Sequence, residues 1–194
     1  MARPALIVVD VQNDFCPGGA LAVPEGDSIV PVLNRYVRLF GERGWPVFAS
    51  RDWHPARTGH FRDFGGAWPV HCVRGTAGAE LHRALQLPPD ATIVSKGQDP
   101  DSDGYSAFQA TTTEEAGLAA ALASRAVDRV WVGGLATDYC VKATVLDALA
   151  RGLRASFLID ASRGVNLKPH DSELAIAEMV RAGADVVTLE RPRL

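Results

Sequence analysis

The amino-acid sequence predicts a three-layer α/β/α fold with a mainly parallel central sheet of about six strands. Two observations support this prediction. Short apolar runs rich in Val and Ile recur along the chain without alternating apolar and polar residues, which is typical of strands buried on both faces of a parallel sheet. Segments with the apolar spacing of helices lie between these runs, and such alternation produces right-handed βαβ crossovers. Because 194 residues fit one compact core, we expect a single domain spanning residues 1–194.

The apolar runs define the expected strands. They lie at residues 5–9, 47–49, 92–94, 130–132, 157–159 and 186–189. The first of them, ALIVV, is apolar at every position, so neither of its faces suits solvent. We therefore expect these strands to be covered by helices on both sides.

Four segments are expected to be helices. The first has apolar positions at Ile29, Val32, Leu33, Tyr36 and Phe40. The second has them at Leu118 and Leu122, and the third at Val141, Val145 and Leu149. The fourth is the segment 172–182. The first set recurs at i, i+3, i+4, i+7 and i+11, which places one apolar stripe along the helix. Gly44, Gly152 and Gly183 follow the first, third and fourth segments, and glycine commonly ends a helix.

Residues 54–79 have neither the strand period nor the helix period. This segment contains Gly, Pro, Trp and His in close succession. Loops of this length in a compact domain usually carry function. We therefore expect the segment to belong to a site rather than to a layer of the fold.

Composition and charge exclude several classes of protein. Lys and Arg number 20 against 23 Asp and Glu, and the net charge of −3 does not suit binding to nucleic acid or to an anionic membrane. No apolar stretch approaches the roughly 18 residues that cross a bilayer, and the N-terminus lacks the features of a secretory signal. Cys16, Cys72 and Cys140 are too few and too scattered for a disulfide framework, and we expect the first two to be structural. The sequence therefore indicates a soluble, cytoplasmic protein with free thiols.

Chemically active side chains follow four of the expected strands. Asp10 follows the first strand, Asp52 and His54 follow the second, Lys96 follows the third and Cys140 follows the fourth. Sites in open α/β sheets form beyond the carboxyl ends of the strands. We therefore expect an acid, an amine, a thiol and a pair of metal ligands on one rim of the sheet.

Cys140 lies where a helix is expected to begin, with Thr137 or Asp138 as the N-cap. A thiol in the first helical turn faces the positive end of the helix dipole, which favours the thiolate. A buried, unreactive thiol is the alternative. Asp10 and Lys96 favour the nucleophile, because the acid can accept the thiol proton and later donate it to a leaving amine, while the lysine stabilises the ionised groups.

Asp52 and His54 begin a second set of candidate ligands, which His60 and His71 continue. Carboxylate and imidazole ligands suit Zn(II), Fe(II) or Mn(II), so we expect one divalent metal ion. Solvated loop histidines are the alternative, but three of the five histidines in the chain lie in this segment. The other two lie in helical contexts and are expected to be structural: His82 and His170.

Aromatic residues gather in the same part of the chain and near its N-terminus. They are Phe15, Trp53, Phe61, Phe64, Trp68 and, further along, Tyr105. Packing of a long loop onto the sheet is one interpretation of this pattern. The other is a flat slot for an aromatic ring that is polar at one end.

Five segments together make the chain similar to a known family. They are VVDVQNDFCPGGALAV (8–23), SRDWHP with GHF (50–61), WPVHCVRGTAGAELH (68–82), KGQDPDSDGYSAF (96–108) and VGGLATDYCVKATVLDAL (132–149). On these motifs, which span nearly the whole chain, the sequence resembles the nicotinamidases, also called pyrazinamidases, of the isochorismatase-like cysteine hydrolase superfamily. The resemblance implies the isochorismatase-like hydrolase fold.

The resemblance also implies a role for each matching residue. Asp10, Lys96 and Cys140 correspond to the catalytic triad. Asp52, His54 and His71 correspond to metal ligands. The backbone N–H groups of Ala136 and Cys140 correspond to the oxyanion hole. The substrate pocket corresponds to Phe15, Trp68 and Tyr105. The Leu135–Ala136 peptide corresponds to a cis peptide. His60 matches a position that some members use as a further ligand and others do not.

The activity implied is hydrolysis of nicotinamide to nicotinate and ammonia through a cysteine thioester, in NAD salvage, with pyrazinamide as an expected second substrate. Carbamoylsarcosine-type or ureidoacrylate-type amidohydrolases are the alternative among enzymes, since they keep the acid, lysine and cysteine but lack the D-x-H…WPxHC set. A non-catalytic nicotinamide-binding module is the alternative outside enzymes. The sequence leaves open which metal binds and whether the chain forms a homo-oligomer.

Overall fold

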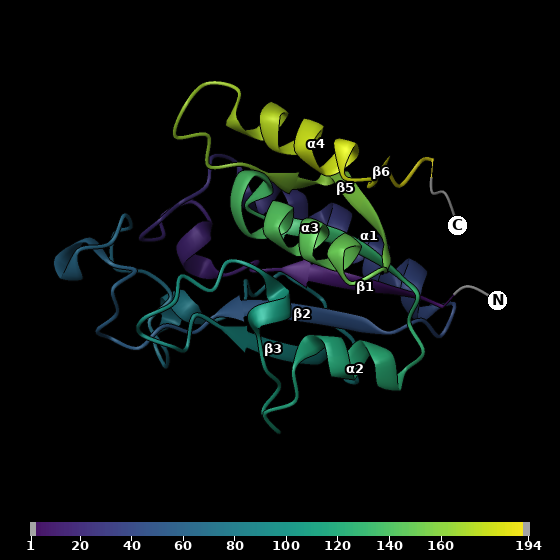
Figure 1. The fold of residues 1–194 in the computed structure, drawn as a ribbon, viewed down its shortest axis with the longest axis horizontal. Helices are drawn as coiled ribbons and strands as arrows, with labels where there is room; N and C mark the ends of the chain where they lie inside the picture. Colours follow the sequence, from purple (N-terminus) through teal and green to yellow (C-terminus); the bar gives the residue numbers. More distant parts are fainter. Residues whose placement is uncertain (1–2, 192–194) are drawn as a thin grey trace.

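The computed structural model describes residues 3–191, and within them six strands form one sheet (Figure 1). The strands are β1 (Pro4–Val9), β2 (Val47–Asp52), β3 (Thr92–Lys96), β4 (Arg129–Leu135), β5 (Arg154–Arg163) and β6 (Asp185–Val187). Neighbouring strands are parallel throughout, in the order β3-β2-β1-β4-β5-β6. The predicted sheet is confirmed, although β2 and β3 run further than expected and end on the candidate residues Asp52 and Lys96.

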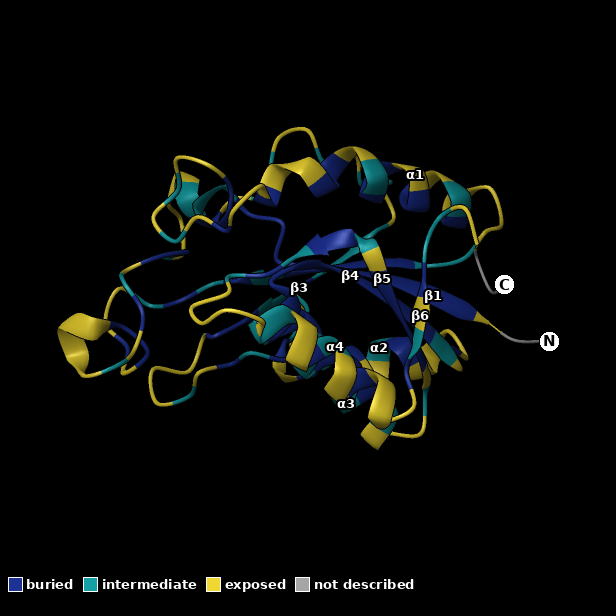
Figure 2. Ribbon diagram, turned by 90° about the horizontal axis from the view of Figure 1, so that it is seen from above, coloured by how far each residue is buried: buried dark blue, intermediate teal, exposed yellow. Residues whose placement is uncertain are grey.

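Helices cover both faces of this sheet (Figure 2). Four α-helices lie in the described range, namely α1 (Val30–Gly41), α2 (Leu118–Ser124), α3 (Lys142–Ala150) and α4 (Asp171–Arg181). Helix α1 packs on one face, whereas α2, α3 and α4 pack on the other, so the predicted three layers are present. The first helix begins later than its apolar spacing suggests, because Gly26–Ile29 forms a 3-10 turn ahead of it.

The β1 strand shows why its sequence is apolar at every position. Leu6 and Val8 belong to the core beneath α1, whereas Ala5, Ile7 and Val9 belong to the core on the opposite face. All five side chains are fully buried. Burial of one large aliphatic side chain contributes about 1.5–3 kcal/mol, so this single strand stabilises both cores.

Successive strands are added to the sheet on one side of β1 and then, from β4 onward, on its other side. From β1 the chain adds β2 and β3 on one side, and it then crosses over to build β4, β5 and β6 on the other. In doubly wound sheets the loops diverge at such a point and leave a crevice beyond the carboxyl ends of the strands. Figure 1 shows the long loops gathered at that end of the sheet, which is where a site is expected.

Two features of the fold bear on the remaining sequence predictions. Within residues 3–191, no helix has both the length and the apolar character needed to cross a bilayer. The helical context expected for His82 is wrong, because His82 follows an isolated bridge residue and its N–H donates to the carbonyl of Val11. His170 directly precedes α4, in the left-handed backbone region.

Candidate active site

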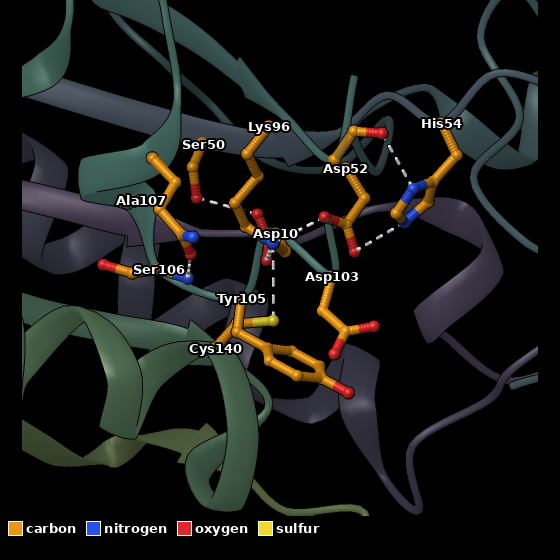
Figure 3. Close-up of polar contacts among 12 residues, drawn as sticks. Asp10, Ser50, Asp52, His54, Lys96, Asp103, Tyr105, Ser106, Ala107 and Cys140 are labelled. Atoms are coloured by element: carbon orange, nitrogen blue, oxygen red, sulfur yellow. Dashed lines mark hydrogen bonds and ion pairs between the residues drawn. The ribbon is translucent and has the colours of Figure 1, made fainter. Parts of the chain in front are cut away.

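Lys96 lies at the centre of a buried cluster at the carboxyl edge of the sheet (Figure 3). Its Nζ is 2.9 Å from Oδ2 of Asp10, 2.5 Å from Oδ1 of Asp52 and 3.4 Å from Sγ of Cys140. All four side chains are buried. The structure therefore brings together the acid, the amine and the thiol that the sequence placed on one rim, and the ammonium joins them to the first candidate metal ligand.

The parallel register explains how distant residues reach this cluster. Asp52 and Lys96 are the last residues of β2 and β3 and are direct register partners. Asp10 follows β1 in the left-handed backbone region, at φ 49°, which is uncommon for residues other than glycine and tends to occur at functional sites. Ser50 of β2 donates from Oγ to Oδ1 of Asp10 at 2.7 Å, and this bond orients the carboxylate (Figure 3).

Burial and charge set the protonation of the cluster. Burial raises the pKa of Asp10 to about 6, against the opposing charge of Lys96. Burial would also raise the pKa of Asp52, but the charge of Lys96 outweighs it and holds that pKa below its usual range. Burial would lower the pKa of Lys96, but the two carboxylates outweigh it and raise that pKa well above its usual value. At neutral pH the cluster therefore holds two carboxylates and one ammonium, an excess of one negative charge.

The Cys140 side chain is a neutral thiol in this environment. Burial raises the pKa of the thiol well above its usual range, and Lys96 offsets only part of the rise. The thiolate expected at a helix start is therefore not the resting form, because loss of hydration outweighs the helix dipole. Sγ and a carboxylate oxygen of Asp10 lie within 4.8 Å of each other, so Asp10 is in place to accept the thiol proton.

The turn that carries the thiol differs from the one predicted. It is a π-helical segment, Thr137–Val141, that continues into α3, and π-helical turns are frequent at functional sites. Ala136 occupies the N-cap position, so the N-cap predicted at Thr137 or Asp138 is wrong. The Asp138 carboxylate instead accepts hydrogen bonds from the N–H of Val165, at 2.9 Å, and from the N–H of the next residue, at 2.7 Å.

The backbone on either side of Cys140 is held in place. The Leu135–Ala136 peptide is cis, as the resemblance implied. After the thiol, Oγ1 of Thr144 donates to the carbonyl of Cys140 at 2.7 Å and accepts from the N–H of Ala107 at 3.0 Å. The chain on which the predicted oxyanion hole depends is therefore fixed by bonds to α3 and to the segment after β3.

Three imidazoles converge with Asp52 beside this cluster. One ring nitrogen from each of His54, His60 and His71 lies within 4.8 Å of the other two. Oδ2 of Asp52 is 3.7 Å from Nε2 of His54 and 4.0 Å from Nε2 of His71. The structure thus brings all four candidate ligands together, His60 among them.

Hydrogen bonds fix which nitrogen of each ring carries the proton. Nδ1 of His54 lies 3.0 Å from the carbonyl oxygen of Gly97, Nδ1 of His71 lies 2.7 Å from that of Pro69, and Nδ1 of His60 lies 2.7 Å from a carboxylate oxygen of Asp103. Carbonyl and carboxylate oxygens only accept, so each Nδ1 carries the hydrogen and each Nε2 keeps a lone pair. This arrangement, with Nδ1 bonded outward and Nε2 free, is the one that metal-binding histidines adopt.

The surroundings of these rings fit a divalent cation. Burial lowers the pKa of His71 to about 4 and also lowers the pKa of His60, so both rings are neutral. Nε2 of His54 is buried and has no hydrogen-bond partner within residues 3–191. A cation would satisfy this nitrogen and would balance the excess negative charge beside Lys96. One carboxylate and three imidazoles therefore make a donor set suited to Zn(II), Fe(II) or Mn(II).

A pocket opens over Cys140, His60 and His71. Its walls include the three predicted aromatic residues, Phe15, Trp68 and Tyr105. Nε1 of Trp68 donates to the Tyr105 hydroxyl at 2.9 Å, which fixes both rings. The other three aromatic residues do not line the pocket. Trp53 packs against the core and Phe61 is buried, whereas Phe64 faces solvent.

Sequence reasoning missed several residues around this pocket. Leu21, Tyr139 and Val165 also line it. Tyr139 directly precedes Cys140 and its ring lies edge-on to Trp68, with 4.9 Å between ring centroids, so adjacency to the thiol was the available signal. Ser50 and Asp103 reach the site through partners distant in sequence, and neither had a local signal.

Cys16 and Cys72 are free and buried, and neither lines the pocket. Burial raises the pKa of both thiols, that of Cys16 to about 11. The N–H of Cys72 donates to the Asp14 carboxylate at 2.7 Å, which ties this part of the loop to the segment after β1. These contacts fit structural roles.

Comparisons with known proteins agree with this geometry. The family model of the isochorismatase domain matches residues 4–191. The nicotinamidase of Escherichia coli strain K12 is 46% identical over 205 aligned residues, which cover 97% of this chain and 96% of that protein. The solved pyrazinamidase of Pyrococcus horikoshii in complex with zinc superposes with a TM-score of 0.89 at 49% identity, covering 96% of this chain and 99% of that one. The structure of PnC1 from L. infantum in complex with nicotinate gives a TM-score of 0.84 at 32% identity, covering 97% and 94%.

Proposed function

This chain belongs to the isochorismatase domain family, and from that premise we propose that it hydrolyses nicotinamide to nicotinate and ammonia, and pyrazinamide in the same way. One observation carries the proposal beyond family membership. The Lys96 ammonium contacts an acid, a thiol and a metal-ligand carboxylate at once, at the base of an aromatic pocket. Such a site can bind a flat ring and attack an amide attached to it.

The first half of the reaction forms a thioester. Asp10 accepts the proton of the Cys140 thiol, and the sulfur attacks the carboxamide carbon, so that a C–S bond forms as the carbonyl electrons move to oxygen. The backbone N–H groups of Ala136 and Cys140 stabilise that oxyanion. Each such donor lowers the activation barrier by about 3–4 kcal/mol. Collapse of the intermediate breaks the C–N bond, and Asp10 donates its proton to the amide nitrogen, which leaves as ammonia.

The second half of the reaction hydrolyses the thioester. Asp10, again a carboxylate, accepts a proton from water, and the oxygen attacks the thioester carbon. The C–S bond breaks, the proton held by Asp10 returns to the Cys140 sulfur, and the acid product loses its remaining proton to solvent and leaves as nicotinate. Lys96 stays protonated throughout, because its two carboxylate neighbours keep its pKa well above the working pH. It therefore stabilises each negative charge that appears on Asp10 or on the sulfur.

Asp52, His54, His60 and His71 would hold one divalent metal ion. When bound, that ion supplies a Lewis acid that can take the ring nitrogen of nicotinamide and so orient the carboxamide toward Cys140. Among Zn(II), Fe(II) and Mn(II), zinc is the ion to test first, since the similar Pyrococcus horikoshii pyrazinamidase was crystallised with zinc. Phe15 and Trp68 would flank the ring, and Tyr105 would complete the wall of the pocket.

We infer that residues 1–194 act as one domain and that the reaction takes place in the cytoplasm, in NAD salvage. Three free, buried thiols support a reducing compartment. The site is built from residues at or after the ends of four neighbouring strands, β3, β2, β1 and β4, which supports a single working unit. A small molecule is the partner that this site requires.

Ammonia release tests the substrate assignment. Purified protein is assayed with nicotinamide, pyrazinamide and N-carbamoylsarcosine, before and after metal removal by a strong chelator and again after zinc is added back. We expect both ring amides to be hydrolysed, activity to disappear with the metal, and zinc to restore it. Hydrolysis of the carbamoyl compound with inert nicotinamide would instead support the carbamoylsarcosine-type alternative, and release from none of them would support a binding module.

A further inference from the structure

We propose that Asp103 is the positioning residue that makes His60 a metal ligand, an inference that rests on the metal site of the proposed function. His60 is the ligand whose role the sequence left open. Its Nδ1 lies 2.7 Å from Oδ1 of Asp103 (Figure 3 shows Asp103 beside the site). The His60 side chain is 3% exposed, whereas that of Asp103 is 60% exposed, so a solvated carboxylate orients a buried ring.

The other two histidines are held differently. The Nδ1 partners of His54 and His71 are backbone carbonyl oxygens, which no substitution removes. Of the three rings, His60 is the one whose Nδ1 faces a side chain. The participation of His60 in metal binding therefore depends on the residue at position 103. A substitution at that position can therefore test one metal ligand separately from the others.

The hydrogen bond from His60 to Asp103 sets the tautomer and the basicity of the His60 ring. A carboxylate only accepts hydrogen bonds, so it keeps the proton on Nδ1 and leaves the Nε2 lone pair for the metal. It also raises the basicity of that nitrogen, which strengthens ligation. The ring of His60 stacks on that of His54, with 4.7 Å between centroids and 20° between planes, but stacking alone does not select a tautomer. Without Asp103 the proton is free to move to Nε2 and block the ligand.

A purely structural role for Asp103 can be separated from this one. Asp103 lies on the loop after β3, and His60 lies on the long segment after β2. The two loops are also joined at Pro100, whose carbonyl accepts from Oγ1 of Thr58 and from the N–H of Gly59, each at 2.9 Å. Loss of the Asp103 carboxylate therefore leaves the loops tied while it releases the ring of His60.

Metal affinity is the readout that tests the proposal. Zinc dissociation constants are measured by chelator competition on the metal-stripped and reloaded protein, for Asp103→Ala, Asp103→Asn, His60→Ala and the double variant. We expect Asp103→Ala to raise the dissociation constant about 10- to 100-fold. Asp103→Asn, which keeps an acceptor oxygen, should lie between Asp103→Ala and the parent. In the His60→Ala background the same Asp103→Ala change should have no further effect, because its target is gone.

Two further measurements control the result. Asp101→Ala removes an equal charge from the same exposed loop, and its zinc affinity should match that of the parent. The visible spectrum of bound cobalt(II), which reports the number of ligands, should be the same for Asp103→Ala as for His60→Ala. The proposal is overturned if Asp103→Ala binds zinc as the parent does, or if it weakens zinc equally with and without His60. Zinc binding that behaves as expected in a protein that does not hydrolyse nicotinamide would remove the proposed function and leave the role of Asp103 intact.

Discussion

Lys96 is the residue on which the proposed catalytic and metal-binding groups both depend. Its ammonium lies against Asp10, Asp52 and Cys140, all buried. Removing one partner of a buried ion pair costs about 3–5 kcal/mol, because a charge is left without compensation. Lys96 therefore keeps the site folded as well as charged, and the carboxylates on either side keep Lys96 protonated.

Residue identity made most of the site predictable. Asp10, Lys96 and Cys140 each carry a distinctive chemistry and each lies at or just after the end of a strand, so the sequence alone placed them on one rim. Ser50 and Asp103 could not be found in this way. Each acts through a partner 40 or more positions away in the chain, and serine and aspartate in such settings usually have only local roles.

The pKa of Asp10 predicts the pH dependence of the reaction. Asp10 must be a carboxylate to accept the thiol proton, and burial, partly opposed by Lys96, raises its pKa to about 6. A cation at Asp52 would act in the same direction as Lys96 and lower that pKa. We therefore expect kcat/KM for nicotinamide to be flat near neutral pH and to fall about tenfold per pH unit below an acid limb at or under pH 6.

Ser50→Ala provides the check on this assignment. The Ser50 hydroxyl donates to the Asp10 carboxylate, which favours the ionised form, so its loss raises the pKa of Asp10. The acid limb of the kcat/KM profile should therefore move to higher pH in Ser50→Ala, while the rate at high pH changes much less. An acid limb that stays in place would mean that another group controls the profile.

At the scale of elements, the turn between β4 and α3 sets the position of Cys140, the proposed nucleophile. The helical period predicted α3, but it could not distinguish a π-helical first turn from an α-helical one. This turn also contacts the segment after β5. The Asp138 carboxylate holds Val165 and its neighbour by two backbone N–H bonds, and Val165 forms part of the pocket wall.

The two bonds of Asp138 predict a substrate-binding defect. Hydrogen bonds to a charged group contribute about 1.5–3 kcal/mol each, so Asp138→Ala should release the segment that carries Val165. We expect KM for nicotinamide to rise tenfold or more, with a smaller fall in kcat, in steady-state assays. Asp138→Asn, which keeps one acceptor oxygen, should be milder, and Asp147→Ala should match the parent, because the half-buried Asp147 side chain on α3 pairs with Arg151 and does not line the pocket. Equal losses in Asp138→Ala and Asp147→Ala would contradict this role.

Glycine at position 97 is a second constraint at this scale. Gly97 follows β3 at φ +66°, and a Cβ there would lie 2.4 Å from Cε1 of His54. The close approach lets the Gly97 carbonyl orient that ring. This constraint could not be predicted from the sequence, because the clash involves a residue from the neighbouring loop.

At the scale of the whole molecule, the site is a consequence of strand order. Residues from β1, β2, β3 and the turn after β4 meet because the four strands are parallel neighbours with their carboxyl ends at one edge. The continuous apolar runs predicted the parallel sheet and its three layers. Three features could not be predicted from the sequence: the strand order, the pairing of the loops at Pro100 and the resting protonation of Cys140. Each depends on contacts between segments that no local period encodes.

The central claim is that the Cys140 thiol is the nucleophile of an amide hydrolysis. The most direct test measures ammonia release from nicotinamide by Cys140→Ala, alongside nicotinamide binding to the same metal-loaded variant by calorimetry. We expect the ring still to bind, since the aromatic walls and the metal ligands are unchanged, and we expect turnover to fall to the uncatalysed rate. Appreciable ammonia release by a variant that binds nicotinamide would contradict it.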